Sequence, residues 1–163
     1  MDEISLRQEI LKGEDSSRQF KREVTNALSL AAEVAAFLNT TGGRIFVGVD
    51  RDGVICGLTQ QQLEVLNQLV SNASTQNIVP SVGLLTENVT TSDGVVMVIT
   101  VEDGQDKPYQ TSDGFFWVKR GSDKRRVTSR TELRRMFQAG HEVYAESRTV
   151  AGTMACPAAS TAT

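Results

Sequence analysis

The chain has 163 residues, of which 39% are hydrophobic and 23% charged, with a formal net charge of −3 at pH 7. This length suits one domain with its own core, and the composition is ordinary for a globular protein. No stretch has the apolar length of a membrane span, and the N-terminus lacks the order of a signal peptide. We therefore expect a cytoplasmic protein with no membrane partner.

Metal sites built from cysteine or histidine are excluded by count and spacing. Cys56 and Cys156 lie far apart and fit neither a zinc spacing nor a disulfide framework, and His141 is the single histidine. We expect no resident cofactor from these residues.

The first half of the chain alternates helices with extended segments. A short helix is predicted over 5–12 and an extended segment over 18–24. Asn26 or Thr25 caps a helix over 27–38 that is apolar on most sides and should be buried.

The segment after this helix contains the glycine pair Gly42 and Gly43. Nucleotide-binding glycine loops run from strand into helix, whereas this pair runs from helix into strand. We therefore predict a turn in which glycine supplies a positive φ, and no phosphate cradle. A strand over 44–50 should follow and pair in a hairpin with 53–58.

The second half should add a helix, several strands and a last helix. The continuous apolar run at 95–101 predicts a central strand. The remaining elements are expected at 60–73 (helix), 80–89 (strand), 115–119 (strand) and 129–139 (helix capped by Thr128 or Ser129). The order predicts an α+β domain over 1–146, with a mixed β-sheet covered by helices, and a disordered tail over 147–163.

Positive charge is concentrated near the end of this domain. Between Trp117 and Arg135 there are eight Lys and Arg residues against two acids. Such a run is usually a solvated surface, but here it produces a local positive field that favours a polyanionic partner. The candidates for phosphate contacts are Lys119, Arg120, Lys124, Arg125, Arg126, Arg130 and Arg134, with Arg135 alongside.

Local patterns refine this surface. Lys124, Arg125 and Arg126 are expected in a loop. Strand alternation places Phe116 opposite Phe115 and Trp117, and we expect Phe116 in the core. Trp117 is left open, since an exposed aromatic beside arginines would suit single-stranded substrate.

Four motifs occur together in this chain: GEDSSRQFK, AAFLNTTGGRIFVGVDRDGVICGL, KPYQTSDGFFWVKRGS and SRTELRRMF, beginning at residues 13, 35, 107 and 129. In this order they resemble the Schlafen/AlbA-type DNA-binding domain of bacterial proteins. The resemblance implies a Schlafen AlbA-like fold and a nucleic-acid-binding module, often the first domain of a transcriptional regulator or a RecG-like helicase-related protein. The chain has no Gly-Lys-Ser/Thr phosphate loop for an ATP-driven motor.

The Schlafen branch also implies a metal-dependent nuclease with three acidic residues. The matching positions here are Glu14, Gln19 and Asp50, with Asp52 as a near alternative to the last. An amide at Gln19 lacks the charge that Mg²⁺ or Mn²⁺ seeks, so the two carboxylates would hold such an ion only weakly. We treat these positions as vestigial and keep the nuclease as an alternative.

The sequence thus predicts a binding module, with DNA as the expected partner. Lys21, Arg22 and Arg44 are secondary candidates for phosphate contacts, and Lys21 could equally pair with Glu14 or Asp50. A third hypothesis is a homodimer or protein-interaction module joined through exposed strand edges.

Overall fold

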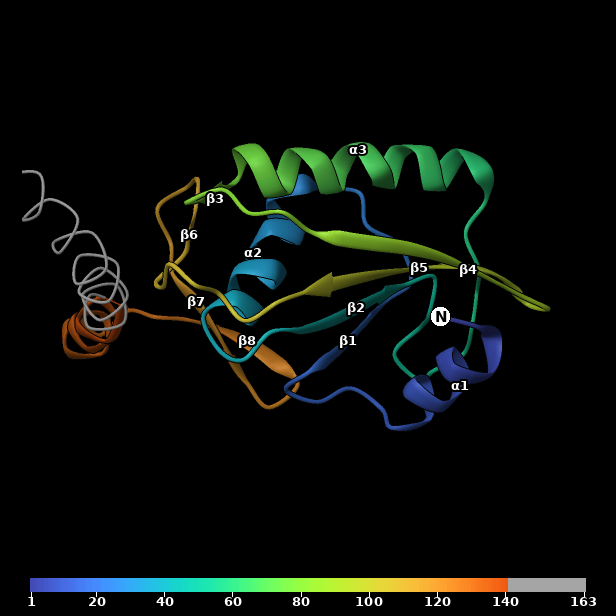
Figure 1. The fold of residues 1–163 in the computed structure, drawn as a ribbon, viewed down its shortest axis with the longest axis horizontal. Coiled ribbons are helices and arrows are strands. Elements are labelled where there is room, and N and C mark those ends of the chain that lie inside the picture. The colour runs from blue at the N-terminus through green and yellow to red at the C-terminus, as the bar shows by residue number, and fades with distance from the viewer. Residues whose placement is uncertain (141–163) are drawn as a thin grey trace, which may run out of the picture.

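A four-stranded mixed sheet lies at the centre of the computed structural model, which describes residues 1–140 (Figure 1). The strand order is β1-β2-β5-β4; β1 and β2 are parallel, and the other neighbours are antiparallel. The predicted mixed sheet is therefore confirmed, and the apolar run at 95–101 forms an interior strand. The strands are β1 (Arg18–Lys21), β2 (Gly43–Val47), β4 (Leu85–Thr91) and β5 (Gly94–Val101).

Helices cover both faces of this sheet. In Figure 1, α3 runs along one side with α2 beneath it, and α1 lies on the other side. Asn26 caps α2 as predicted, accepting from the backbone N–H of Ser29. The helices are α1 (Glu3–Leu11), α2 (Ala27–Leu38), α3 (Gln60–Gln76) and a last helix over 130–140 that begins after Ser129. No described helix has the length and apolarity needed to cross a membrane.

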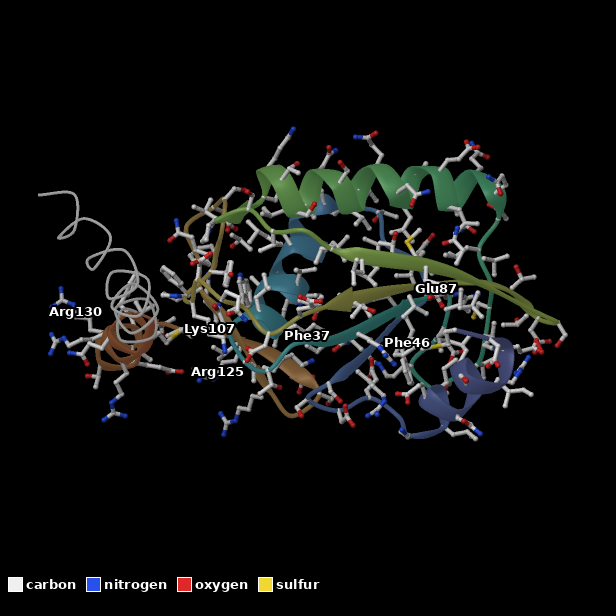
Figure 2. All side chains as sticks on the ribbon, in the orientation of Figure 1. Phe37, Phe46, Glu87, Lys107, Arg125 and Arg130 are labelled. Atoms are coloured by element: carbon white, nitrogen blue, oxygen red, sulfur yellow. The ribbon has the colours of Figure 1, made fainter. Side chains whose placement is uncertain are left out.

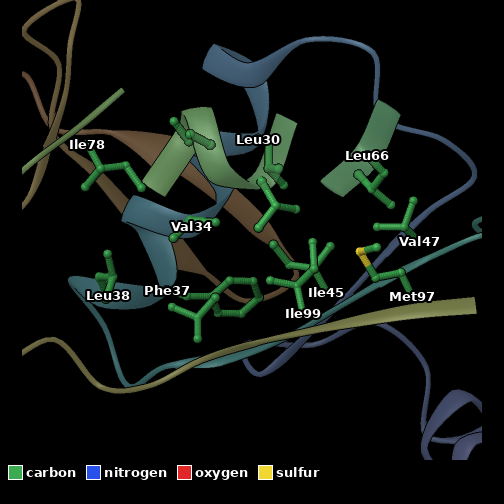
Figure 3. Close-up of a cluster of buried hydrophobic side chains, with 14 of the residues drawn as sticks. Leu30, Val34, Phe37, Leu38, Ile45, Val47, Leu66, Ile78, Met97 and Ile99 are labelled. Carbon is green, nitrogen blue, oxygen red and sulfur yellow. The ribbon is translucent and has the colours of Figure 1, made fainter. Parts of the chain in front are cut away.

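Side-chain alternation along the strands divides the core in two. Ile45 and Ile99 point toward α2 and α3, where they join Phe37 (Figure 3). Phe46 points the other way, and its ring meets Phe20 edge to face at 5.8 Å under α1. Because α2 contributes to the larger cluster from Leu30 to Leu38, it is buried after its first turn, as its apolar sequence predicts.

Two short antiparallel pairs complete the fold at one end of the sheet. β3 (Ile78–Val79) pairs with β6 (Gln110–Thr111), and β7 (Trp117–Arg120) pairs with β8 (Asp123–Arg126). The β7–β8 hairpin packs against α2 on the side away from the sheet. As a result, α2 lies between the sheet and the hairpin.

Three predicted elements differ from the observed ones. The Lys124–Arg126 segment is strand β8, not a loop, because it pairs with β7 across a tight turn. The predicted hairpin of 44–50 with 53–58 is confirmed only next to its turn, where Val49 and Ile55 form an antiparallel bridge and the Asp50 N–H donates to the Val54 carbonyl. The rest of the first segment is β2, which pairs with β1 and β5 instead. Gly57 has a φ of 75°, which breaks an extended conformation there. The strand expected from Pro80 begins at Leu85.

The glycine turn after α2 is confirmed. Gly42 has a φ of 77°, and its N–H donates to the carbonyl of Phe37 at 2.8 Å. The chain then enters β2 with no helix N-terminus available for a phosphate. The predicted tail at 147–163, which includes Cys156, lies outside the described residues, and so does His141.

Candidate nucleic-acid interface

The β7–β8 hairpin is fastened to the end of α2 by Asn39. Its Nδ2 donates to the carbonyls of Tyr109 and Trp117, both at 2.8 Å, and its Oδ1 accepts from the Tyr109 N–H at 2.7 Å. The neighbouring Thr40 hydroxyl accepts from the Lys119 N–H at 3.0 Å. The sequence indicates only a helix end at these two residues, because their partners lie 70 and 79 positions away along the chain.

Beneath the hairpin, a buried carboxylate holds two of the predicted phosphate-binding lysines. Glu33 on α2 is 4% exposed, and its Oε1 accepts from Lys124 Nζ at 2.8 Å and from Lys21 Nζ at 3.1 Å. Burial opposes ionisation of Glu33, but the hydrogen bond from Lys124 and the charge of Lys21 outweigh it and hold the carboxyl pKa below its ordinary value. The two lysines join α2 to β1 and β8.

Lys119 is also turned inward. It is 8% exposed, and its Nζ donates to Gln19 Oε1 at 3.0 Å and to the Ser122 carbonyl at 2.8 Å. Burial lowers the pKa of Lys119, against the opposing charges of Glu33 and Glu14. We call Lys21, Lys119 and Lys124 the inner lysines, because the fold already employs their amines.

The acidic positions implied by the nuclease resemblance have local partners. Glu14 Oε1 accepts from Gln19 Nε2 at 3.1 Å and from the Phe20 N–H at 2.9 Å, which fixes the start of β1. Asp50 Oδ1 accepts from the N–H groups of Asp52 and Val54 and so closes a turn. Within residues 1–140, no three His, Cys, Asp or Glu side chains come together to hold a metal ion.

Arginines make up the outer side of the same region. In the described part of the chain, the outer arginines (Arg120, Arg126, Arg130 and Arg134) are exposed and make no ion pair. Arg125 is different, since it pairs with Glu132 of the last helix at 2.6 Å. In Figure 2, Arg125 and Arg130 lie at the same end of the molecule, and Figure 1 shows α1 at the other.

The secondary candidates lie away from this end. Arg22 is exposed just after β1, and Arg44 is half-buried in a shallow hollow beside Arg18 and Glu9. The structure therefore does not gather all of the predicted cations on one surface.

Aromatic rings lie among the hairpin cations. The Arg126 guanidinium is 4.3 Å from the centroid of the Phe115 ring, and Lys124 Nζ is 5.7 Å from that of Trp117. The Trp117 indole N–H donates to Thr111 Oγ1 at 3.3 Å. Phe116 was expected in the core but is half-buried, because its ring packs edge to face on Phe137 of the last helix.

Comparisons with known proteins agree with this fold. Residues 14–128 match the Schlafen, AlbA_2 family. No curated protein matches the chain. The DIP2311 protein from Corynebacterium diphtheriae is similar in structure, with a TM-score of 0.55 and 23% identity over 76% of this chain. The match spans 26% of that protein, about a quarter of its length.

A second solved structure covers a similar part of the chain. It is the N-terminal domain of a RecG-related protein from Nitrosomonas europaea, with a TM-score of 0.50 and 18% identity over 77% of this chain and 94% of that domain. At 23% and 18% identity, the two structural similarities support the fold of this chain and nothing further.

Proposed function

Because this chain belongs to the Schlafen, AlbA_2 family, we propose that it is a non-catalytic nucleic-acid-binding domain, directed to DNA, whose outer arginines contact phosphates. The observation that carries this proposal is the division of the cations. The inner lysines already have protein partners, whereas the outer arginines keep their N–H donors exposed at one end of the molecule.

The chemistry of arginine supports this assignment. A guanidinium presents a planar fork of donors that matches two phosphate oxygens, and it is more weakly hydrated than an ammonium group. Arg130 and Arg134 lie one helical turn apart on the last helix, and Arg126 is exposed on β8, four residues before that helix begins. Arginines one helical turn apart can contact successive phosphates of a sugar–phosphate backbone.

The structural neighbour suggests a context for the domain. The Nitrosomonas europaea structure belongs to an ATP-dependent DNA helicase RecG-related protein. By analogy, this chain would act as the DNA-contacting part of a helicase-related protein or transcriptional regulator, and the motor or regulatory activity would lie elsewhere.

Fluorescence anisotropy with labelled single- and double-stranded DNA and RNA, titrated against salt, tests the proposal. The double variant R126Q/R130Q should weaken binding to every sequence. It should also reduce the slope of log K against log salt by roughly 0.7–0.9 for each phosphate that is no longer neutralised. The control R7Q/R51Q removes the same charge from α1, where Arg7 pairs with Asp93, and from the turn after Asp50. Equal weakening in both variants, or an unchanged slope, would contradict the proposal.

Self-association is a second candidate because β4 is an outer strand of the sheet. Leu85 on this strand is 63% exposed, and strand edges pair readily with one another. Light scattering over a concentration series would detect a homodimer, and a monomer mass throughout would reject it.

A further inference from the structure

Two phenyl rings are exposed next to the outer arginines. Phe115, just before β7, is 39% exposed, and Phe137, on the last helix, is 53% exposed. Single exposed apolar side chains are ordinary on a protein surface, so exposure alone assigns them no role. These two rings are set apart by their neighbours, which are exposed guanidinium groups.

The chain holds Phe115 against Arg126. The Phe115 carbonyl accepts from the Thr111 N–H at 2.9 Å, and the Val127 N–H donates to the Phe116 carbonyl at 2.8 Å. These bonds bring the segment before β7 to the end of β8, where the Arg126 guanidinium lies over the Phe115 ring at 4.3 Å from its centroid. A stacked guanidinium keeps its N–H donors in its own plane. Arg126 can therefore bind a phosphate while its face stays on the ring.

Phe137 continues a stripe of arginines along the last helix. Arg130, Arg134 and Phe137 are spaced i, i+4 and i+7, which places them on one face of this helix. The Phe137 ring also meets Phe116 edge to face at 5.6 Å, and this contact limits its movement. Phe137 is thus an anchored ring that stays half-exposed beside two guanidinium groups.

Each of the two rings has its own surroundings. Phe115 lies under Arg126, whereas Phe137 contacts Phe116, so we treat them as two separate sites. Trp117 belongs to neither site. It is half-buried, its indole N–H donates to Thr111, and Lys124 lies over its ring.

A ring beside a phosphate-binding arginine distinguishes between forms of nucleic acid. In a duplex the bases stack on one another, and a protein meets phosphates, sugars and groove edges. In a single strand the base next to a bound phosphate can stack on an aromatic ring, and every base has a face for this. Phosphates on Arg126, Arg130 or Arg134 would therefore bring bases to the rings only where the strand is unpaired.

We propose that this domain binds single-stranded DNA, with phosphates on the outer arginines and bases stacked on Phe115 and on Phe137. The inference rests on the proposed function and adds to it a substrate class and two residues that contact bases. Because stacking does not depend on the identity of the base, we expect little sequence preference. Duplex DNA would bind through the arginines alone.

Fluorescence anisotropy with a mixed-sequence single strand, and with the duplex of the same sequence, tests the two rings. Phe115→Leu and Phe137→Leu should each weaken single-strand binding by about tenfold, the effect of losing one stacked base. The slope of log K against log salt should stay the same, because a phenyl ring releases no counterion. Duplex binding should change by less than about twofold, since paired bases do not reach the rings.

Two further variants serve as controls. Phe115→Tyr retains an aromatic ring and should restore single-strand binding relative to Phe115→Leu. Leu11→Ala removes an apolar side chain that is 85% exposed at the end of α1, and binding of neither form should change.

The possible outcomes separate the inference from the proposed function. Equal weakening of single-strand and duplex binding, or no weakening by either leucine substitution, would overturn the stacking sites. Absence of wild-type binding to both forms would overturn the nucleic-acid function itself. If Phe137→Leu does not fold, NMR of the wild-type protein decides. A short single strand should shift the ring protons of Phe115 and Phe137 upfield, and equal shifts with the duplex would count against stacking.

Discussion

The inner lysines and the outer arginines are neighbours in sequence but differ in what they contact. Lys119 and Lys124 reach inward to Gln19 and Glu33, which lie about a hundred residues earlier. Arg120 and Arg126, on the same two strands, remain exposed. Strand alternation separates Lys119 from Arg120 on β7. Lys124 and Arg126 share one face of β8, and they differ because Lys124 reaches Glu33 on α2 whereas Arg126 lies over the Phe115 ring.

The difference shows that a count of basic residues overstates a binding surface. An ammonium on a flexible stem can reach a buried carboxylate and lose its water there, while a guanidinium fork is better suited to phosphate. Three of the cations predicted to bind phosphate are therefore structural in this fold. The division can be tested by substitution, by pH and by binding.

The largest effect is expected from breaking the inner set. Replacing Lys21 and Lys124 with methionine leaves Glu33 charged and buried without the two cations that pair with it. The free energy of unfolding should fall by about 3 kcal/mol, the lower end of the range for breaking a buried pair. Urea denaturation measures it. The control R120Q/R126Q should change it by no more than about 0.5 kcal/mol. Equal destabilisation of both variants would show that the inner lysines are no more important for the fold than the outer arginines.

Asn39→Ala should have the next largest effect. It removes one hydrogen bond to Trp117 at the start of the hairpin and two to Tyr109 just before β6, leaving two carbonyls and one N–H without their partner. We expect a loss of about 2 kcal/mol together with weaker nucleic-acid binding, because the hairpin carries two of the outer arginines. Denaturation and anisotropy on the same sample check both effects. Full binding affinity in a destabilised variant would show that the hairpin is not part of the interface.

The pH dependence of stability tests the carboxylate that pairs with two of the inner lysines. The folded pKa of Glu33 lies below its ordinary value of 4.5, so below pH 4.5 the unfolded chain binds more protons. This contribution to stability is present above pH 4.5 and is lost as the pH falls through the folded pKa. The Glu33→Gln variant lacks this contribution. Below pH 4.5, the free energy of unfolding of the wild-type protein should therefore fall more steeply with pH than that of the variant. Urea denaturation at a series of pH values measures this. If the free energies of unfolding of the two proteins change in parallel with pH, Glu33 is not the source of the dependence.

The smallest effect is expected at Arg125, the hairpin cation that belongs to neither set. Its pair with Glu132 is partly exposed, so Arg125→Gln should cost only about 0.5 kcal/mol. A double-mutant cycle with Glu132→Gln would isolate the pair. A coupling several times larger would mean that the last helix is held mainly by this contact.

Much of the fold could be predicted because its signals are local. Asn26 before an apolar run, and the continuous hydrophobic residues of β5, predict a helix and a central strand at almost their observed positions. β8 could not be predicted in this way, because Lys-Arg-Arg has little intrinsic strand preference. It is held instead by β7 and by the distant Glu33.

The site was less predictable because its partners are long-range. The motif order located Glu14 and Gln19, yet the contact of Gln19 with Lys119 depends on the hairpin folding back onto β1. The sequence does contain one local signal for the buried carboxylate. Glu33 is the single charged residue in α2, a helix that is otherwise almost entirely apolar, so its charge had to be met inside the protein.

The position of α2 between the sheet and the hairpin also determines how the domain opens. Its backbone amides are shielded on both sides, so those from Leu30 to Leu38 should exchange with deuterium only when the whole domain unfolds. The hairpin amides depend on one short pairing and can exchange through local opening. An oligonucleotide that slows exchange in the hairpin while leaving the α2 amides unchanged would locate its contact without any substitution.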